Sequence, residues 1–354
     1  MCAPIIIRAD TQVCPYRESM EKENELIVSP WPHIKSEVSV EKIMWSVVFA
    51  LIPATFVGVY IFGYKSLEVV LLCTAGALIS EALVLKTMGK DITIISDGSA
   101  VLTGLLLGLN LPPGSPWWIS VVGSIVAIAI GKQVYGGLGY NPFNPALVAR
   151  VFLLISFPVE MTRWELPHPI LSGVDAVSGA TPLGALQMGR LAGKGLGDAA
   201  NLSLMDAFIG NIGGSIGEIS AAALLLGAIY LFYKGYITWH IPVSMLGTVF
   251  IFSGIFWVID PARYASPLFH LLTGGLILGA FYMATDMVTS PITTKGQLIF
   301  GFGCGFLTII IRMWGGYPEG VSFSILLMNA LTPLIDKYVR PTHFGEMKDA
   351  ARAI

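Results

Sequence analysis

Residues 43–63 read IMWSVVFALIPATFVGVYIFG, an apolar run in which no side chain carries a charge. A helix needs about 20 such residues to cross the hydrocarbon of a bilayer. The whole chain has a matching composition, because 54% of its 354 residues are hydrophobic and only 12% are charged. A soluble domain carries about 25% charged residues. We therefore expect an all-α polytopic membrane protein whose main solvent is lipid.

Further apolar segments follow this run, so that five lie on each side of a long polar interval. Several segments are short or contain Gly and Pro. Such segments persist at membrane depth only where protein or a wet cavity satisfies their backbone groups. The sequence thus predicts about ten transmembrane helices, some of them broken. We expect these helices at residues 43–63, 67–85, 92–111, 117–134, 145–158, 219–233, 241–259, 268–284, 298–313 and 321–335.

The two sets of five segments resemble each other. The sequence QVYGG at 133–137 aligns with RMWGG at 312–316, and each precedes a Pro-containing turn and a final apolar segment. An odd number of spans in each half inverts one half relative to the other, as in many transporters. We expect five regions: a cytoplasmic N-terminal segment (1–41), a first five-helix repeat (42–158), an outer-face loop (159–217), a second five-helix repeat (218–338) and a cytoplasmic tail (339–354).

The distribution of positive charge predicts the orientation. The N-terminal segment mixes charge with polarity, and its short apolar run is no signal peptide. With this segment in the cytoplasm, most of the 21 Lys and Arg residues fall on the cytoplasmic side, as the positive-inside rule requires. Both termini are then cytoplasmic. Five crossings place the interval 159–217 on the outer face.

Several classes of site are excluded by residue pattern. The chain has no basic cluster with interleaved aromatic residues of the kind that binds nucleic acid. Its four cysteines form no CxxC pair, so we expect no zinc or iron–sulfur site; they are Cys2, Cys14, Cys73 and Cys304. Cys73 and Cys304 lie in apolar runs, where cysteine usually acts as a small hydrophobe.

Glycine and histidine patterns give no cofactor site either. The GxGxG patterns at 193–197 and 301–305 follow no strand, so a dinucleotide-binding fold is not expected. Close helix packing through small residues explains the second pattern better. Only His240 and His270 flank predicted spans, and the predicted topology puts them on opposite faces. A pair of haem ligands at one depth is therefore missing.

Ionisable side chains within the predicted spans are the first candidates for function, because they are costly in a membrane. The possible intramembrane polar or ion path consists of Asp97, Lys132, Arg150 and Asp286. Structural alternatives exist: Lys132 could extend to the inner surface, and the two aspartates could cap broken helices. The asparagines of the NPFNP sequence, Asn141 and Asn144, are natural turn residues.

A second candidate lies in the polar interval, where residues 175–183 read DAVSGATPL. The hydroxyl of Thr181 follows Gly179 and Ala180, which leave room for an enzyme to reach it. The structural alternative is that Thr181 caps a helix that starts near Leu183, since Pro182 is favoured in a first helical turn. Capping and covalent modification coexist only if the side-chain oxygen is not required as the cap.

Several longer motifs resemble one family of membrane redox subunits. They are SPWPHI at 29–34, SDGSAVLTG at 96–104, GKQVYGGLGYNPFNP at 131–145, SGAT at 178–181, MATDMVTSP at 283–291 and GYPEGV at 316–321. Together they resemble the D subunits of Rnf complexes, which pass electrons between ferredoxin and NAD while moving sodium ions or protons. The B subunits of sodium-pumping NADH:quinone reductases are homologous. The resemblance runs from about residue 29 to residue 335.

The resemblance implies a cofactor and partners. FMN would be attached to Thr181 as a phosphodiester, with Asp175, Ser178, Gly179 and Ala180 forming the rest of the attachment motif. A second flavin, riboflavin, would be bound non-covalently. The partners would be the other membrane and peripheral subunits, among them a small outer-face flavoprotein, together with a flavin transferase for maturation. The chain would then be a subunit of an ion-translocating oxidoreductase and would catalyse nothing alone.

Two interpretations compete with a redox subunit. Broken helices, an inverted repeat and polar groups at mid-depth also suit a channel or secondary transporter. A passive scaffold for partner subunits would leave Thr181 unmodified and replaceable. The motif around Thr181 favours the redox subunit, because a plain transporter has no need of it. Between the two related families, the short polar N-terminal region favours the Rnf type over the quinone reductase.

Overall fold

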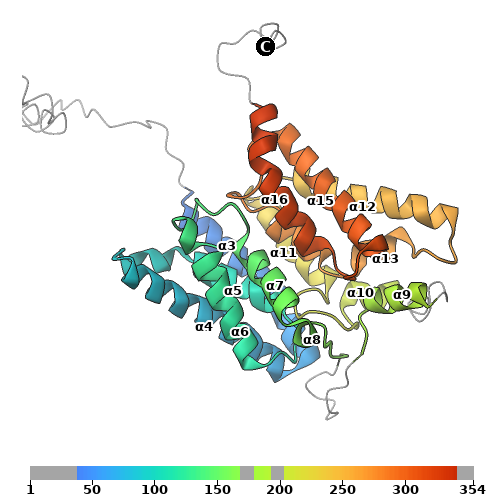
Figure 1. Cartoon of the computed structure of the whole chain (residues 1–354), viewed down its shortest axis with the longest axis horizontal. Coiled ribbons are helices and arrows are strands. Elements are labelled where there is room, and N and C mark those ends of the chain that lie inside the picture. Colours follow the sequence, from blue (N-terminus) through green and yellow to red (C-terminus); the bar gives the residue numbers. More distant parts are fainter. Residues whose placement is uncertain (1–37, 168–178, 193–202, 341–354) are drawn as a thin grey trace, which may run out of the picture. The chain divides into compact units, whose positions relative to one another are not determined.

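The computed structural model describes residues 38–167, 179–192 and 203–340, which form helices and no strand (Figure 1). Within these ranges, five helices are long and apolar enough to cross a membrane: Val40–Phe62 (α3), Tyr64–Thr87 (α4), Trp117–Tyr135 (α6 with η2 and η3), His240–Ile259 (α12) and Thr294–Trp314 (α15). Three apolar helices are shorter: Ser99–Asn110 (α5), Pro145–Ser156 (α7) and Ala221–Tyr233 (α11). This content confirms an all-helical, multi-pass membrane protein.

Shorter elements connect these helices. They are Ile92–Asp97 (η1), Pro158–Met161 (α8), Pro182–Leu191 (α9), Leu204–Ile209 (α10), Pro267–Leu272 (α13), Leu276–Leu278 (α14), Gly279–Met283 (η5) and the longer final helix Val321–Tyr338 (α16). The interval predicted as a loop at 159–217 therefore contains helical segments, of which α9 begins directly after Thr181.

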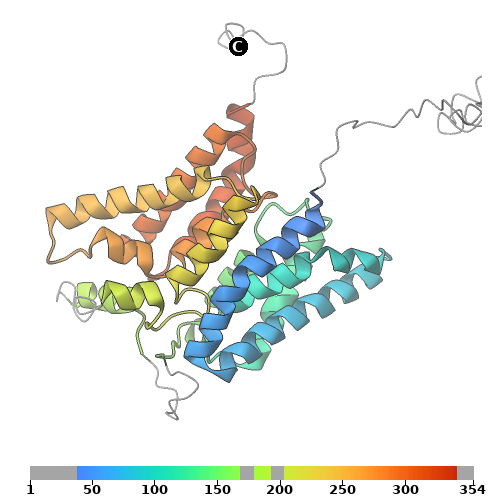
Figure 2. The same ribbon diagram turned by 180° about the vertical axis from the view of Figure 1, so that it is seen from behind.

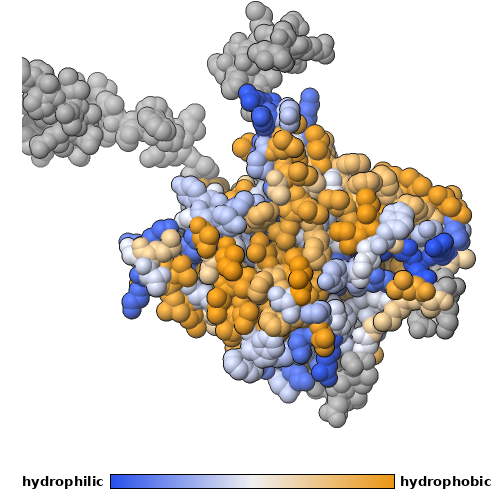
Figure 3. Space-filling model, in the orientation of Figure 1, coloured by the Kyte–Doolittle hydropathy of each residue, from blue (hydrophilic) through white to orange (hydrophobic). Residues whose placement is uncertain are grey.

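The outward faces of the long helices are apolar, because lipid rather than water surrounds them. On α3, Phe49 and Phe56 are 62% and 71% exposed, whereas Leu51 on the opposite face is fully buried. Apolar residues likewise cover much of the visible surface over α15 and α16, with hydrophilic residues gathered towards the ends of these helices (Figure 3). The surface is thus apolar where that of a water-soluble protein would be polar. The interior is a packed apolar core, as it is in water-soluble proteins.

Two predicted helices are broken, as expected, and each break contains a glycine with positive φ. The segment predicted at 92–111 is interrupted at Gly98 (φ 77°), between η1 and α5. The segment predicted at 268–284 is interrupted at Gly274 (φ 70°), between α13 and α14. Because side chains disfavour this left-handed conformation, glycine is the residue suited to such a reversal. The breaks expose backbone groups that neighbouring side chains then satisfy.

The GxGxG pattern at 301–305 packs α15 against its neighbours. A Cβ atom on Gly301 would lie 2.8 Å from the main-chain oxygen of Ile241, and one on Gly305 would lie 2.6 Å from that of Met245. Gly303 faces Met328 of α16 instead. Small residues at these positions let α12 approach α15 along its length. The prediction of close helix packing is confirmed.

Helices from the two parts of the sequence also meet. Helix α3 packs against α11, and the two run side by side when the protein is seen from behind (Figure 2). At this contact Gly227 lies directly against the main-chain oxygen of Ala50, closer than any side chain would allow. The hydroxyl of Tyr282, which belongs to the second half like Gly227, lies 3.5 Å from the main-chain oxygen of Ala50 and donates a shorter hydrogen bond to that of Leu224 at 2.8 Å. The halves of the chain are thus joined backbone to backbone.

Candidate functional site

Thr181 lies at the N-terminus of helix α9. Its backbone is extended (φ −65°, ψ 157°), and its Oγ1 accepts a hydrogen bond from the backbone N–H of Gly184 at 3.1 Å. Pro182 follows as the first helical residue. These are the features of an N-cap, and they confirm the capping role considered for Thr181. The side chain is only 5% exposed, so the helix end holds it in a fixed place.

Helix α9 is fastened to the C-terminal end of α15. Gln187 donates a hydrogen bond to the main-chain oxygen of Gly315 at 2.9 Å. The guanidinium of Arg190 donates to the main-chain oxygens of Arg312 and Met313, at 3.4 and 2.5 Å. Burial lowers the pKa of Arg190 from its ordinary value, but an arginine stays protonated. The carbonyls at a helix C-terminus lack partners within the helix, so Arg190 satisfies two of them.

A small cavity of about 10 Å³ lies beside Thr181, between the start of α9 and the loop that precedes α11. Glu218, Glu319 and the backbone around Gly213 form part of its wall. A space of this size holds about one water molecule. An isoalloxazine ring does not fit in it, so any flavin carried by Thr181 lies outside this cavity.

Two of the residues that line the cavity, Glu218 and Glu319, carry carboxyl groups, and arginines lie near them. Arg150 and Glu319 form an ion pair, with 2.6 Å between Nη2 and Oε2. The guanidinium of Arg312 donates to the main-chain oxygens of His270 and Thr273, at 2.6 and 3.0 Å. These carbonyls belong to the end of α13, at the helix break near Gly274. Arg312 therefore satisfies backbone groups that the break leaves free.

Glu218 is the unusual member of this group. It lies in the loop before α11, is 6% exposed, and forms no ion pair within the described ranges. Burial, followed by the nearby carboxylate of Glu319, raises the pKa of Glu218 to about 8, although Arg150 and Arg312 act in the opposite direction. A buried carboxyl of this kind is neutral over much of the physiological pH range.

The predicted attachment motif is only partly within the described residues. Asp175 and Ser178 lie outside them. Gly179 donates its N–H to the main-chain oxygen of Trp164 at 3.0 Å, and a Cβ here would lie 2.9 Å from Leu166. Ala180 is exposed. The close contact with Leu166 explains glycine at position 179.

A second polar cluster is buried among α4, α5 and the η2–η3 region. Lys132 is 2% exposed; its Nζ lies 2.5 Å from Oε1 of Glu81 and 2.6 Å from Oγ of Ser99. Gln133 donates to the same oxygen of Glu81 at 2.8 Å. The alternative that Lys132 extends to the membrane surface is therefore wrong. A fully buried carboxylate draws the ammonium inward, because neither charge could otherwise be desolvated.

Neither aspartate is the N-cap of a helix, so the predicted capping role is wrong for both. The N-cap of α5 is Gly98, which has no side-chain cap bond; Asp97 precedes it, and its Oδ1 accepts from the backbone N–H of Ser99 at 2.8 Å. The carboxylate of Asp286 follows η5 rather than preceding a helix. It accepts from the N–H of Val288 and from the hydroxyl of Thr289, at 3.3 and 3.2 Å, and so closes a turn.

The two asparagines of the NPFNP sequence act locally, as predicted. Asn141 donates to the main-chain oxygen of Phe143 at 3.0 Å and closes the turn. Oδ1 of Asn144 accepts from the N–H of Ala146 at 3.1 Å as the N-cap of α7, and Nδ2 donates to the main-chain oxygen of Met283 at 3.3 Å. Asn144 therefore also ties the start of α7 to the end of η5.

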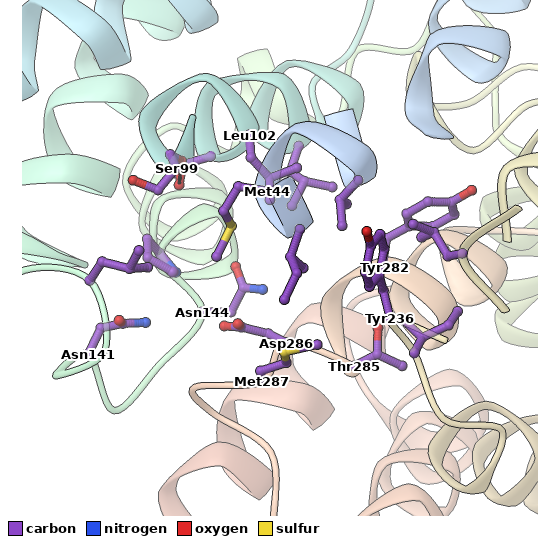
Figure 4. Close-up of a pocket in the computed structure, with 18 of the residues that line it drawn as sticks. Met44, Ser99, Leu102, Asn141, Asn144, Tyr236, Tyr282, Thr285, Asp286 and Met287 are labelled. Carbon is purple, nitrogen blue, oxygen red and sulfur yellow. Dashed lines mark hydrogen bonds between the residues drawn. The ribbon is translucent and has the colours of Figure 1, made fainter. Parts of the chain in front are cut away.

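These groups border a larger cavity of about 90 Å³ between the two parts of the chain. In the close-up, Ser99, the neighbouring Asn141 and Asn144, and Asp286 approach this space from different helices and loops (Figure 4). Most of its remaining wall is apolar, and Lys132 also contributes to it. The structure thus brings Lys132, Asp97 (through Ser99) and Asp286 to one region. Arg150 is not among these residues and belongs to the Thr181 region instead.

The sequence analysis missed two buried carboxylates. Glu81 and Glu218 were not singled out, yet both are buried next to candidate residues. Each had a signal: Glu81 interrupts an apolar helix, and Glu218 stands immediately before one. An acidic residue in such a position is expensive and therefore worth attention. Cys73 and Cys304 are buried and unpaired in the apolar core, as predicted; Cys2 and Cys14 lie outside the described residues.

Comparison with known proteins gives the family. The D subunit of a proton-translocating ferredoxin:NAD(+) oxidoreductase complex from Clostridium ljungdahlii is 50% identical over 93% of this chain and 98% of its own length. The D subunit of a Na(+)-translocating ferredoxin:NAD(+) oxidoreductase complex from Acetobacterium woodii is 47% identical over 92% and 97%. The D subunit of an ion-translocating oxidoreductase complex from Stutzerimonas stutzeri is 47% identical over 87% and 92%. A model of the NQR2, RnfD, RnfE family matches residues 27–345, and the chain therefore belongs to that family.

Proposed function

We propose that this chain is the D subunit of an ion-translocating ferredoxin:NAD oxidoreductase and relays electrons through FMN bound covalently to Thr181. Relatives with this name cover nearly all of the chain at 47% to 50% identity. The same names favour this assignment over the B-type subunit of a sodium-pumping quinone reductase. The chain works as part of the complex and has no activity of its own.

The observation that carries the proposal is the position of Thr181 at the N-terminus of α9. A phosphodiester on this hydroxyl keeps one negative charge. The free N–H groups and the dipole at a helix N-terminus favour such a charge. The cap itself uses Oγ1, so the phosphate oxygens would take over the hydrogen bond from Gly184. The Thr181 hydroxyl would therefore cap α9 before attachment, and the phosphate would cap it afterwards.

The residues of the chain would position the cofactor rather than react. FMN, when bound, supplies transfer of one or two electrons. Gln187 and Arg190 hold α9 on α15, which keeps the attachment point at a fixed distance from the membrane helices. The small cavity leaves no room for the ring, which therefore faces outward beside Ala180. There it meets its partner carriers.

The proposal includes a topology. Ten spans in two inverted five-helix repeats, 42–158 and 218–338, would leave the segments 1–41 and 339–354 in the cytoplasm. The segment 159–217, with Thr181, would lie on the outer face of a bacterial or archaeal cytoplasmic membrane. The broken helices near Gly98 and Gly274 support the repeat, because they occupy the third position in each half. The small outer-face flavoprotein subunit would then be the natural partner of Thr181, and a flavin transferase would attach the FMN.

Coupling to ions belongs to the same proposal. The cavity bordered by Lys132, Asn144 and Asp286 places polar groups between the two halves of the chain, and it supports a role in moving sodium ions or protons. Riboflavin, the non-covalent second flavin of such complexes, is part of the proposal without assigned residues. The same cavity supports the second candidate function, a channel or secondary transporter without redox activity.

In-gel flavin fluorescence separates the two functions. The full chain would be produced with a flavin transferase from a host that carries such a complex, beside T181V and T181N. Asparagine removes the hydroxyl but remains a good N-cap, so T181N controls for the loss of the helix end. A fluorescent wild-type band that is absent from both variants, with a mass increase of FMN less one water, supports the proposal. A dark wild-type band, with another substrate labelled in the same cells, favours the transporter.

A further inference from the structure

Helix α10 exposes an apolar face, although it belongs to the polar interval of the sequence. The four residues of this α10 face are all exposed, Met205 by 65% and Ile209 by 56%; the other two are Leu204 and Phe208. Their spacing along the chain puts them on one side of the helix. Exposed apolar side chains that gather on one face, rather than standing singly, indicate a contact surface.

The opposite side of α10 packs against the ends of two membrane segments. Ala207 is fully buried in an apolar cluster that includes Phe62, the last residue of α3, and Leu272, the last residue of α13, packs against the same cluster. Both residues lie within runs whose hydropathy predicts membrane spans, at 43–63 and 268–284. Helix α10 therefore lies beside the ends of these spans and not beyond them.

Exposed residues near this cluster indicate the edge of the bilayer. Tyr60 and Tyr64, which stand on either side of Phe62 in sequence, are both exposed. Tyrosine is enriched where a membrane meets water. On α13, Leu268 is one turn before Leu272 and is exposed as well. The α10 face thus continues an apolar surface at the depth where acyl chains meet headgroups.

We propose that the α10 face is a lipid-binding surface: α10 lies in the interfacial region of the bilayer and places its four exposed apolar side chains against phospholipid acyl chains. An apolar helix face of this kind sinks about 5–10 Å into the boundary between headgroups and acyl chains. The one charged residue of the helix, Asp206, is half-buried and lies outside this face, so no charge enters the lipid. The inference does not need FMN on Thr181, and its test is independent of the proposed function.

The test needs one reactive cysteine at a time. Cys73 and Cys304 are buried and unpaired, so they stay unlabelled in the folded chain. Replacing the other two cysteines, with C2S and C14S, gives the background for labelling. M205C then places a nitroxide spin label on the α10 face.

Collision rates of the nitroxide distinguish lipid from water. The full chain would be placed in nanodiscs of phosphatidylcholine and phosphatidylglycerol and exposed to oxygen, which concentrates in lipid, or to a water-soluble nickel chelate. F56C on α3 is the lipid control, and A262C, in the exposed loop after α12, is the water control. We expect the oxygen-to-nickel collision ratio of M205C to be severalfold above that of A262C and close to that of F56C.

Other results overturn the inference. A ratio like that of A262C would mean that the α10 face meets water, and low collision rates with both reagents would mean that protein covers it. The same measurement on the chain assembled with its partner subunits completes the test. Unchanged oxygen collisions of M205C there support the lipid contact, whereas their loss would assign the face to a partner subunit.

Discussion

The guanidinium of Arg190 donates a hydrogen bond to the main-chain oxygen of Met313 and lies over the ring of Tyr264, 5.5 Å from its centre. One side chain thereby fixes helix α9 both to the end of α15 and to the loop that follows α12. Because α9 begins at Thr181, the position of the candidate attachment point depends on a contact at the other end of the same short helix.

Replacing Arg190 by methionine should release α9 from α15. A hydrogen bond with a charged donor is worth about 1.5–3 kcal/mol, and the substitution leaves the carbonyls of Arg312 and Met313 without it. Hydrogen exchange in residues 182–191 should become faster, with little change in α3 and α4. R263M is the matched control, since Arg263 also lies over Tyr264, at 5.9 Å, but is exposed. Equal effects of the two substitutions would contradict the docking role.

Removing the cap of α9 should destabilise that helix by about 1 kcal/mol, the usual effect of losing a side-chain N-cap. We expect this loss in T181V and not in T181N, because asparagine accepts the same hydrogen bond. Exchange of the Gly184 N–H in chains without flavin provides the measurement. If T181N exchanges as fast as T181V, Oγ1 does not act as the cap in solution.

The buried pair of Lys132 and Glu81 should behave as one unit. Breaking a buried pair by removing one partner costs about 3–5 kcal/mol, whereas replacing both by apolar residues costs much less. K132M and E81M should each lower the free energy of unfolding in detergent strongly, and the double variant should recover part of the loss. Strictly additive effects in this double-mutant cycle would show that the two side chains do not depend on each other.

The packing of α12 on α15 should be sensitive to a single methyl group. A Cβ on Gly305 would lie 2.6 Å from the main-chain oxygen of Met245, whereas one on Gly247 of α12 meets nothing within 4 Å. G305A should therefore lower the thermal unfolding temperature. G247A should leave it unchanged or raise it, since alanine is favoured over glycine inside a helix by about 1 kcal/mol. The opposite order would refute this packing.

The stability of the chain without flavin should depend on pH through Glu218. Its pKa is about 8 in the folded chain and 4.5 as an ordinary carboxyl. The folded chain therefore binds a proton that the unfolded chain releases, and this stabilising contribution, complete below pH 4.5, is lost as pH rises to about 8. The slope is at most about 1.4 kcal/mol per pH unit. Denaturant titrations of T181N should show this slope, and T181N with E218Q should lack it.

The sequence predicts the helices better than the contacts between them. Hydropathy marks residues 43–63 and 241–259 because lipid selects for apolar residues along a whole span, and helices α3 and α12 lie where expected. The helix breaks near Gly98 and Gly274 could also be predicted, because glycines and short apolar runs indicate an interrupted helix. The partners of buried charges were not, because Lys132 and Glu81 are far apart in sequence and meet only after α4 and η2 have packed.

The candidate site follows the same division. The capping of α9 by Thr181 is local, so the Thr-Pro pair predicts it. The surroundings of Glu218 depend on four segments that converge around one cavity, and its charge state depends on Glu319, Arg150 and Arg312 together. The sequence alone does not show which of these charged groups lie near one another, so it cannot predict the charge state of Glu218. Lys132 illustrates the cost of reasoning locally: near a helix end it looks able to reach the surface, whereas the structure buries it.

The contact of Gly227 with the backbone of Ala50 bears on how such a protein can move. Transporters with inverted repeats commonly work by rocking one repeat against the other. Here the two halves touch through the backbone of Gly227 and the main-chain oxygen of Ala50, which also lies 3.5 Å from the hydroxyl of Tyr282. A rocking motion would have to separate this contact completely. A close backbone contact of this kind favours a rigid interface between the two halves over one that rocks.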